Sequence, residues 1–270
     1  MKQFEGTLIL TDLDGTLLDG QNRISPENQA AIRHYMENGG RFTVATGRSL
    51  KGMEHFFPAL TVNAPAILYN GSAVYDFQTG EDLYEACVGQ GGYDLVRALM
   101  EALPALGVEV YAGHRPYVAQ ESRLTRRHFE SVKMPWNPCP PEQIPQPWLY
   151  LVITGAPETL AQAEKLICAR FPGQFFTQYS SPTMLEILRQ GASKGRSARF
   201  LIRRLGLDPE KVFPVGDGSN DVELLQCAPN SCAPENACPQ ILALARHILP
   251  DNNSHTIAAL IRRLEKGALL

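Results

Sequence analysis

The stretch TLILTDLDGT, residues 7–16, decides the fold of this chain. Its first half is apolar and predicts a short buried strand over Thr7–Leu10. Two carboxylates, Asp12 and Asp14, follow directly where that strand ends. A plain turn explains single Asp and Gly residues but not this pair, and an EF-hand loop is excluded because Leu17 stands where that loop needs glycine. Because ligands of open α/β sheets bind at the carboxyl ends of strands, the pair indicates a functional site.

Strands and helices alternate after this stretch. Ser25-Pro26 begins a helical pattern that Gly39 ends, and residues 41–46 predict a second buried strand. A short helix over 49–57 and a third strand over 66–69 follow. This alternation predicts an α/β fold, a Rossmann-like, doubly wound parallel sheet.

The pattern changes between residues 82 and 188. We expect there an α+β segment that contains six prolines between Pro135 and Pro147. Its predicted elements are a helix over 92–106, strands over 108–111, 117–120 and 148–153, a helix over 157–170, and a hairpin over 174–188. After Gly191 the alternation returns, with helices over 194–205, after Asp221 and near 256–264, and a strand over 212–215. The sequence therefore predicts a core formed by residues 1–81 and 189–270, and an inserted cap domain formed by residues 82–188.

Composition excludes several classes of protein. The 270 residues are 44% hydrophobic and carry a net charge of −3, without a basic stripe for nucleic acid. The charge-free window over residues 55–75 is interrupted by proline and asparagine, so we expect no membrane association. The apolar run near the N-terminus is too short for a signal peptide, and the six cysteines form no C-x-x-C pair. We expect a cytoplasmic protein with reduced thiols.

A second acidic stretch, GDGSND at residues 216–221, follows another predicted strand. It is not a dinucleotide fingerprint, because Asp221 replaces the third glycine. Asp12, Asp14, Asp217 and Asp221 would then meet at one edge of the sheet, where they need a compensating cation. A small number of carboxylate ligands that leaves room for water and phosphate suits Mg²⁺. We therefore expect Mg²⁺ as the cofactor.

Two further elements suit a phosphate group. Thr46-Gly47 follows the second predicted strand and offers a hydroxyl and a backbone N–H. Lys194 stands at the start of a predicted helix, where its ammonium group and the helix dipole both favour an anion. Each feature alone is common in loops and on surfaces. Their shared position at strand ends and at a helix start favours a phosphate site.

Four motifs together resemble those of the haloacid dehalogenase superfamily: DLDGT at residues 12–16, TGR at 46–48, Lys194-Gly195, and GDGSND at 216–221. The insert lies between the second and third motifs, and Tyr69-Asn70-Gly71 precedes it, as in the Cof-type phosphatases with a large α/β cap. One departure is His255, which stands where many relatives have an acidic-Gly segment.

The resemblance implies a role for each matching residue. Asp12 is expected to be the nucleophile that forms an aspartyl-phosphate, and Asp14 the general acid and then the general base. The implied Mg²⁺ ligands are Asp12, Asp14 through its backbone carbonyl, Asp217 and Asp221. The implied phosphate-binding residues are Leu13, Thr46, Gly47, Lys194 and Asn220. Arg48 and Asn70 are expected to contact the phosphate region or to orient the cap.

These roles predict Mg²⁺-dependent hydrolysis of small phosphorylated metabolites, with sugar phosphates the favoured class. A sugar phosphomutase or phosphotransferase shares the aspartate chemistry and remains an alternative, as does a ligand-binding protein without turnover. In the insert, the polar turn Gly113–Pro116 offers His114 and Arg115 as candidate substrate-binding residues, although such hairpin tips are usually only solvated. The sequence indicates no oligomeric state.

Overall fold

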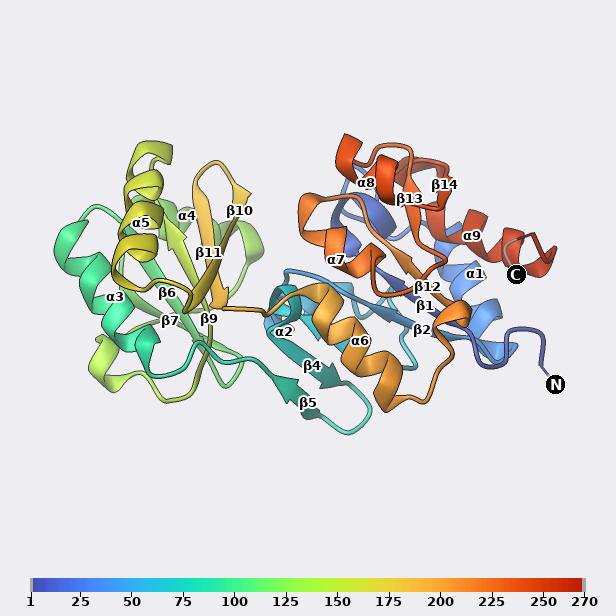
Figure 1. The fold of residues 1–270 in the computed structure, drawn as a ribbon, viewed down its shortest axis with the longest axis horizontal. Coiled ribbons are helices and arrows are strands. Elements are labelled where there is room, and N and C mark those ends of the chain that lie inside the picture. The colour runs from blue at the N-terminus through green and yellow to red at the C-terminus, as the bar shows by residue number, and fades with distance from the viewer. Residues whose placement is uncertain (1, 269–270) are drawn as a thin grey trace. The chain divides into compact units, whose positions relative to one another are not determined.

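The structure, a computed structural model, describes residues 2–268 and divides into two compact units. The first unit contains the stretch through Arg48, then His55–Tyr84, then the stretch from Ser193 onward. The second contains Ser49–Glu54 and Glu85–Ala192. Figure 1 labels most of the helices and strands of each unit. Among residues 2–268, no helix is long and apolar enough to span a membrane.

The first unit is built on a five-stranded parallel sheet in the order β14-β13-β12-β1-β2. The central strand β1 pairs on both sides, so that Leu8 lies opposite Val212 on β12 and Arg41 on β2. Every residue of β1 and β12 is buried, as expected for parallel strands covered on both faces. The strands are β1 (Leu8–Thr11), β2 (Arg41–Val44), β12 (Val212–Val215), β13 (Cys232–Pro234) and β14 (His247–Leu249).

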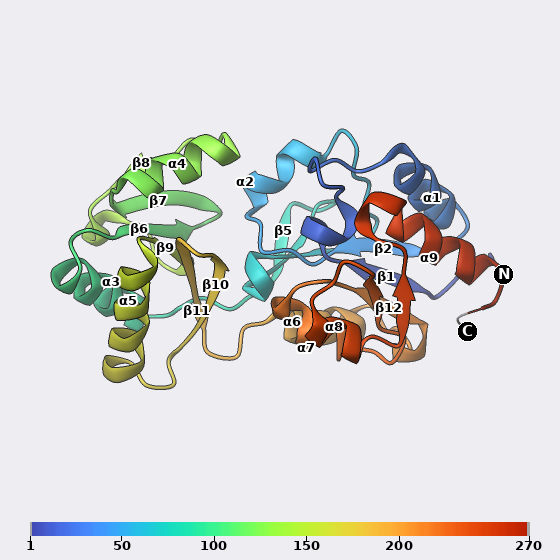
Figure 2. The ribbon, with the colours of Figure 1, turned by 90° about the horizontal axis from the view of Figure 1, so that it is seen from above.

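Helices cover both faces of this sheet, as Figure 2 shows. On one side lie α1 (Pro26–Glu37) and α9 (Thr256–Glu265). On the other lie α6 (Lys194–Arg204), α7 (Val222–Leu225) and α8 (Pro239–Leu244). The Ser25 side chain caps α1 by accepting a hydrogen bond from the Asn28 amide. The predicted doubly wound α/β core is therefore confirmed.

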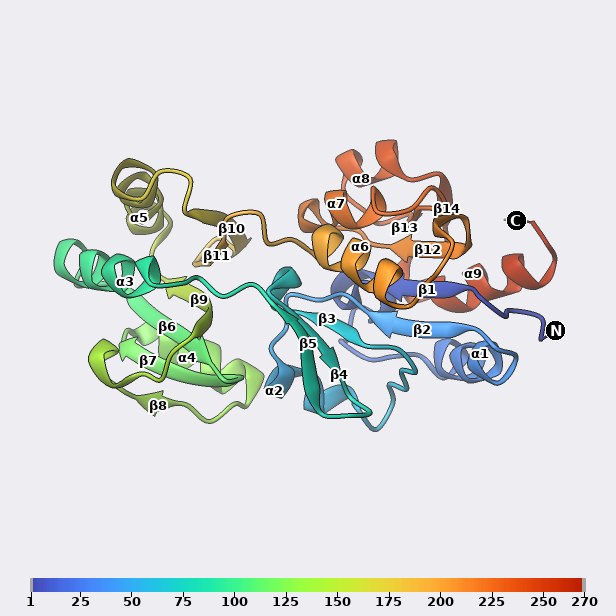
Figure 3. The ribbon, with the colours of Figure 1, turned by 60° about the horizontal axis from the view of Figure 1, so that its bottom comes forward.

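The third predicted strand differs from the expectation. The strand β3 (Ala66–Leu68) belongs to a separate three-stranded sheet, β3-β4-β5, with β4 (Ala73–Asp76) and β5 (Glu81–Glu85), as Figure 3 shows. An isolated parallel bridge between Ala45 and Ile67 links it to the parallel sheet. At the tight turn Tyr69–Gly71 every φ is positive, and the turn folds β4 back antiparallel to β3.

The second unit contains a six-stranded sheet in the order β10-β11-β9-β6-β7-β8. Its pairs are antiparallel except β7–β8, which is parallel. The predicted hairpins over 108–120 and 174–188 are both present. The strands are β6 (Gly107–Ala112), β7 (Arg115–Gln120), β8 (Asn137–Pro138), β9 (Trp148–Thr154), β10 (Phe175–Ser181) and β11 (Met184–Arg189).

Helices lie on both faces of this second sheet. In Figure 2, α3 (Gly91–Ala102) and α5 (Pro157–Arg170) lie on one side of it, and α4 (Arg123–Val132) lies on the other. A short helix α2 (Leu50–Met53) also belongs to this unit. The helix expected to reach Leu106 ends at Ala102, because Pro104 cannot continue a helix and restricts the residue before it.

Candidate active site

The carboxyl ends of three adjacent strands bring the predicted motifs together. Asp12 follows β1 directly, Thr46 comes two residues after β2, and Asp217 two residues after β12. The order β12-β1-β2 makes these ends neighbours. The Asp12 amide donates to the Val215 carbonyl at 2.8 Å, which extends the ladder into the site.

Three carboxylates and one ammonium form the centre of the site. Oxygens of Asp12, Asp217 and Asp221 all lie within 4.8 Å of one another. Lys194, the first residue of α6, donates from Nζ to Asp12 Oδ1 at 2.8 Å and to Asp221 Oδ1 at 2.7 Å. Asp221 also accepts from the amides of Asp217 and Gly218 at Oδ2, at 3.0 and 3.1 Å. Lys194 and Asp221 are almost completely buried.

This burial shifts the protonation of the cluster. Desolvation raises the pKa of Asp12 well above its usual value, although the nearby Lys194 ammonium opposes the shift. Desolvation also raises the pKa of Asp217 to about 6, against a hydrogen bond from the Thr16 hydroxyl and with the charge of Asp221 adding to it. Burial alone would lower the pKa of Lys194, but its two carboxylate partners hold that pKa above its usual value.

The donor set fits a divalent cation. Three carboxylates against one ammonium leave two negative charges uncompensated when all are ionised. A doubly charged ion balances them and offsets the repulsion between the carboxylates, which adds to the desolvation that raises the two aspartate pKa values. Oxygen ligands of this kind are those that Mg²⁺ prefers.

The carboxylate of Asp14 does not join this group of three. It accepts two hydrogen bonds from Arg48, from Nε to Oδ2 at 2.8 Å and from Nη2 to Oδ1 at 2.6 Å. The following Gly15 has φ +79°, and a Cβ there would collide with the Asp217 carboxylate. Only glycine therefore lets the chain turn this close to the cluster.

The candidate phosphate-binding residues form a second layer beside the carboxylates. The backbone N–H of Asn70 donates to the Thr46 carbonyl at 3.0 Å. The side chain of Asn70 accepts at Oδ1 from Asn220 Nδ2, also at 3.0 Å. Gly47 packs closely on Asn70, since a Cβ at Gly47 would lie 2.6 Å from Asn70 Nδ2. The side chain of Leu13 is fully buried, so only its backbone is available to a ligand.

Sequence reasoning missed the groups that hold the Asp12–Thr16 loop. Thr16 donates to the Asp217 carboxylate, and Asn236 Nδ2 donates to the Gly15 carbonyl at 2.8 Å. Asn252 donates to Asn236 and to the Leu18 carbonyl, both at 2.9 Å. No local pattern marks Asn236, but Asn252 lies in the segment singled out by the departure at His255.

His114 and Arg115 lie in the second unit, His114 in the turn between β6 and β7 and Arg115 at the first position of β7. The central residues Gly113 and His114 both have positive φ, 52° and 61°. This is the backbone of a type I′ turn, whose twist matches the flanking strands. The turn is therefore present where the sequence predicts it. A role of His114 and Arg115 in substrate binding stays a prediction.

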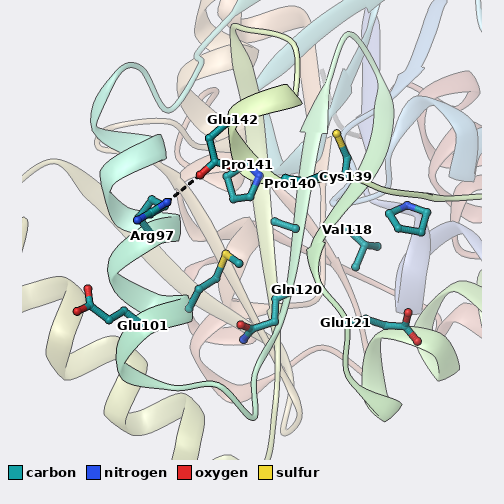
Figure 4. A pocket seen from close by; sticks show the side chains of 12 residues that line it. Arg97, Glu101, Val118, Gln120, Glu121, Cys139, Pro140, Pro141 and Glu142 are labelled. Carbon is teal, nitrogen blue, oxygen red and sulfur yellow. Dashed lines mark hydrogen bonds and ion pairs between the residues drawn. The ribbon is translucent and has the colours of Figure 1, made fainter.

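The second unit also contains a cavity of about 740 Å³. Figure 4 shows its lining from α3, β7 and the proline-rich segment, with the Arg97–Glu142 ion pair at one side. That pair measures 2.8 Å and is largely exposed. None of the predicted site residues lines this cavity.

Fold and site together define an α/β core with an acidic cluster at one edge of its sheet, and an inserted α+β unit. Known proteins agree: the haloacid dehalogenase-like hydrolase family matches residues 9–261, so the chain belongs to this family, as the resemblance predicted. M6_Spy0533 of Streptococcus pyogenes serotype M6, provisionally named a phosphatase, is 29% identical over 95% of this chain and 97% of its own length. Pyridoxal phosphate phosphatase YbhA of Escherichia coli is 25% identical over 94% of this chain and 97% of its own length. The solved structure of a haloacid dehalogenase-like hydrolase of Bacteroides thetaiotaomicron superposes with a TM-score of 0.85 at 26% sequence identity. The superposition covers 96% of this chain and 100% of that protein's chain.

Proposed function

We propose that this protein is a Mg²⁺-dependent phosphatase that hydrolyses phosphoric monoesters of small metabolites. The observation that carries the proposal is the group formed by Asp12, Asp217, Asp221 and Lys194 at the carboxyl ends of the sheet, in which all but Asp217 are buried. Such a group combines a nucleophilic carboxylate with positive charge for a phosphoryl group.

In the first step, a carboxylate oxygen of Asp12 attacks phosphorus and the bond from phosphorus to the leaving alcohol oxygen breaks. Asp14, in its acid form, gives its proton to that oxygen. The product is an aspartyl-phosphate on Asp12. Lys194 touches Asp12 directly, so its charge lies beside the transferring group.

In the second step, water attacks the aspartyl-phosphate and Asp14, now a carboxylate, accepts a proton from that water. The bond from phosphorus to the Asp12 oxygen breaks, so inorganic phosphate leaves and the Asp12 carboxylate is restored. The backbone of Leu13 and the side chains of Thr46 and Asn220, with the backbone of Gly47, are proposed to hold the phosphate oxygens.

Asp12, Asp217, Asp221 and the backbone carbonyl of Asp14 are proposed to hold the metal. When bound, Mg²⁺ supplies charge stabilisation for the phosphoryl oxygens and orients them. The fit rests on the excess of two negative charges in the cluster described above.

The substrate class is a small phosphorylated metabolite, with sugar phosphates favoured. The Escherichia coli relative is named for pyridoxal phosphate, which is a compact phosphomonoester. This name supports a small molecule as the substrate of the present protein. We propose that the second unit selects the leaving group, with His114 and Arg115 as candidate contacts to sugar hydroxyls or to a second anion.

The test is phosphate release from a panel of phosphorylated metabolites with Mg²⁺ present, compared between wild type and Asp12→Asn. The amide is nearly isosteric but cannot attack phosphorus, so we expect turnover to fall by more than about 10³-fold while the fold is retained. Mass spectrometry of the acid-quenched wild type should detect the phosphorylated Asp12 peptide. Residual activity within about tenfold of wild type contradicts the role of Asp12, since that is only 1.4 kcal/mol of barrier.

A further inference from the structure

The pair formed by Arg48 and Asp14 has a geometry that ordinary surface ion pairs lack. Two N–H groups of one guanidinium meet the two oxygens of one carboxylate, at 2.8 and 2.6 Å. Parallel bonds of this kind fix the direction of a carboxylate as well as its distance. Within the same unit, Arg23 and Asp19 provide a contrast, because both Arg23 nitrogens share the single oxygen Oδ2 at 3.3 and 3.2 Å.

Arg48 is itself held from several sides. Its amide donates to Thr46 Oγ1, and its carbonyl accepts from the Tyr69 amide, both at 3.1 Å. Its guanidinium carbon lies 4.7 Å from the centre of the ring of Phe56, which is buried. A guanidinium over an aromatic face is further stabilised by the ring electrons. The group that meets Asp14 is therefore fixed at both backbone and side chain.

The backbone of Asp14 is also fixed, whereas its side chain has few other restraints. The loop that carries it is tied by the bond from the Leu18 amide to the Leu13 carbonyl at 2.9 Å, and by the bond from Asn236 to Gly15. The Asp14 side chain itself is 49% exposed. The two bonds from Arg48 are thus what sets its orientation.

We propose that Arg48 is the positioning residue of Asp14, holding its carboxyl group where the proton must be given and taken. The inference rests on the proposed function, in which Asp14 protonates the leaving oxygen and then accepts a proton from water. Arg48 neither gains nor loses a proton in either step. Each Asp14 oxygen bonded to Arg48 keeps a second lone pair, so the carboxyl group can carry the transferred proton while paired.

This role predicts an effect that depends on the leaving group. An alkoxide departs poorly without a proton, whereas p-nitrophenolate departs readily without one. Misplacing the general acid therefore slows phosphoryl transfer from an alkyl ester far more than from p-nitrophenyl phosphate. A residue that only binds the phosphate, which the two esters share, slows both equally.

The experiment measures kcat/KM for p-nitrophenyl phosphate and for glycerol 1-phosphate, with saturating Mg²⁺, in wild type, Arg48→Gln and Arg48→Lys. We expect Arg48→Gln to lower the value for the alkyl ester about 10–100-fold and the value for the aryl ester less than about threefold. Arg48→Lys keeps the charge but cannot form two parallel bonds, so it should shift the ratio in the same direction. Arg23→Gln, which removes the Arg23–Asp19 pair, is the matched control and should leave the ratio unchanged.

A double-mutant cycle separates the outcomes. In an Asp14→Asn background, Arg48→Gln should produce no further change in the alkyl-to-aryl ratio, because its effect passes through Asp14. An equal loss for both esters, or a ratio change that persists without Asp14, overturns the inference and leaves the proposed function standing. Wild type that releases no phosphate from either ester overturns the proposed function, and the inference with it. Circular dichroism of each variant checks that the fold is retained.

Discussion

Lys194 joins two carboxylates that burial would otherwise make unstable together. Its ammonium lies 2.8 Å from Asp12 Oδ1 and 2.7 Å from Asp221 Oδ1, with only 1% of its side chain exposed. This single positive charge stabilises the ionised form of both carboxylates. Lys194 is the first residue of α6, and the start of that helix places it in the site. Removing it leaves the carboxylates facing one another without compensation.

Lys194→Met should therefore destabilise the metal-free protein by about 3–5 kcal/mol, the usual effect of breaking a buried ion pair from one side. Denaturant unfolding in the presence of a chelator measures this loss. The variant leaves the site more negative, so the stabilisation gained on adding Mg²⁺ should be larger than in wild type. Lys211→Met, at an exposed lysine of the same unit, is the control. A loss below about 1 kcal/mol, typical of surface pairs, would contradict the role of Lys194.

At the residue scale, motif spacing predicted that Asp12, Asp217 and Asp221 meet, but it wrongly placed the Asp14 carboxylate with them and did not predict how each is held. Asp12, Asp217 and Asp221 follow from the strand ends, because neighbouring parallel strands finish at one edge. The partner of Asp14 could not be predicted in this way. Its bond to Arg48 depends on side-chain directions and on a ring at Phe56, neither of which a sequence pattern encodes.

At the scale of elements, β6 and α4 meet through a buried polar pair. Glu109 on β6 is fully buried, and both its oxygens lie 3.0 Å from Nδ1 of His128 on α4. Tyr111 on the same strand donates to Glu109 at 3.5 Å, and Tyr150 on β9 and Glu186 on β11 complete the group. Burial raises the pKa of Glu109 above its usual value, although the bond to His128 opposes the shift.

The sign of the resulting pH dependence follows from this shift. The unfolded chain releases the Glu109 proton near pH 4.5, whereas the folded protein holds it to higher pH. The contribution of Glu109 to stability is therefore largest below pH 4.5 and is lost as the pH rises through the folded pKa. Glu109→Gln cannot ionise, so its free energy of unfolding relative to wild type should increase from pH 4.5 to pH 8.

Denaturant unfolding at several pH values between these limits tests the prediction, with Glu101→Gln at an exposed position of α3 as control. A difference that stays constant with pH would show that attraction to His128 balances the burial of Glu109, and one that falls would show that the attraction outweighs it; either result contradicts the prediction.

The elements that sequence predicted well are the long or strongly apolar ones, such as β9 and α5. The helix α4 was missed, because its sequence RLTRRHFESV is mostly polar and buries only Thr125 and Phe129. The strands β13 and β14 have three residues each, too few to show a period. The strand β3 meets the parallel sheet through the parallel bridge Ala45–Ile67, but its antiparallel sheet with β4 was not predicted, because the reversal at Tyr69–Gly71 depends on positive φ angles, two of them in non-glycine residues.

At the scale of the whole molecule, the insert separates the two halves of the site along the chain. Lys194 and Asp12 are 182 residues apart in sequence yet in direct contact. All the core candidates lie in the first unit, whereas His114 and Arg115 lie in the second. Bringing Lys194 and Asp12 together costs the entropy of closing a long loop. A ligand that binds only the folded site stabilises the folded state and offsets part of that cost.

Mg²⁺ should therefore stabilise the first unit and leave the second largely unaffected. Binding relieves the repulsion among Asp12, Asp217 and Asp221, and is worth about 2.7 kcal/mol at a concentration one hundred times Kd. Hydrogen exchange with and without Mg²⁺ should show added protection at residues 12–17 and 216–221. Amides of β9, in the second unit, should exchange at unchanged rates and serve as an internal control.

Asp217→Asn removes one ligand charge, so the same exchange experiment on this variant should show a weaker response to Mg²⁺. Exhaustive chelation should abolish phosphate release by wild type, and added Mg²⁺ should restore it. Two results contradict the magnesium site: turnover that survives chelation undiminished, or equal protection of both units. The second result would show that Mg²⁺ acts on the molecule as a general salt and not through the acidic cluster.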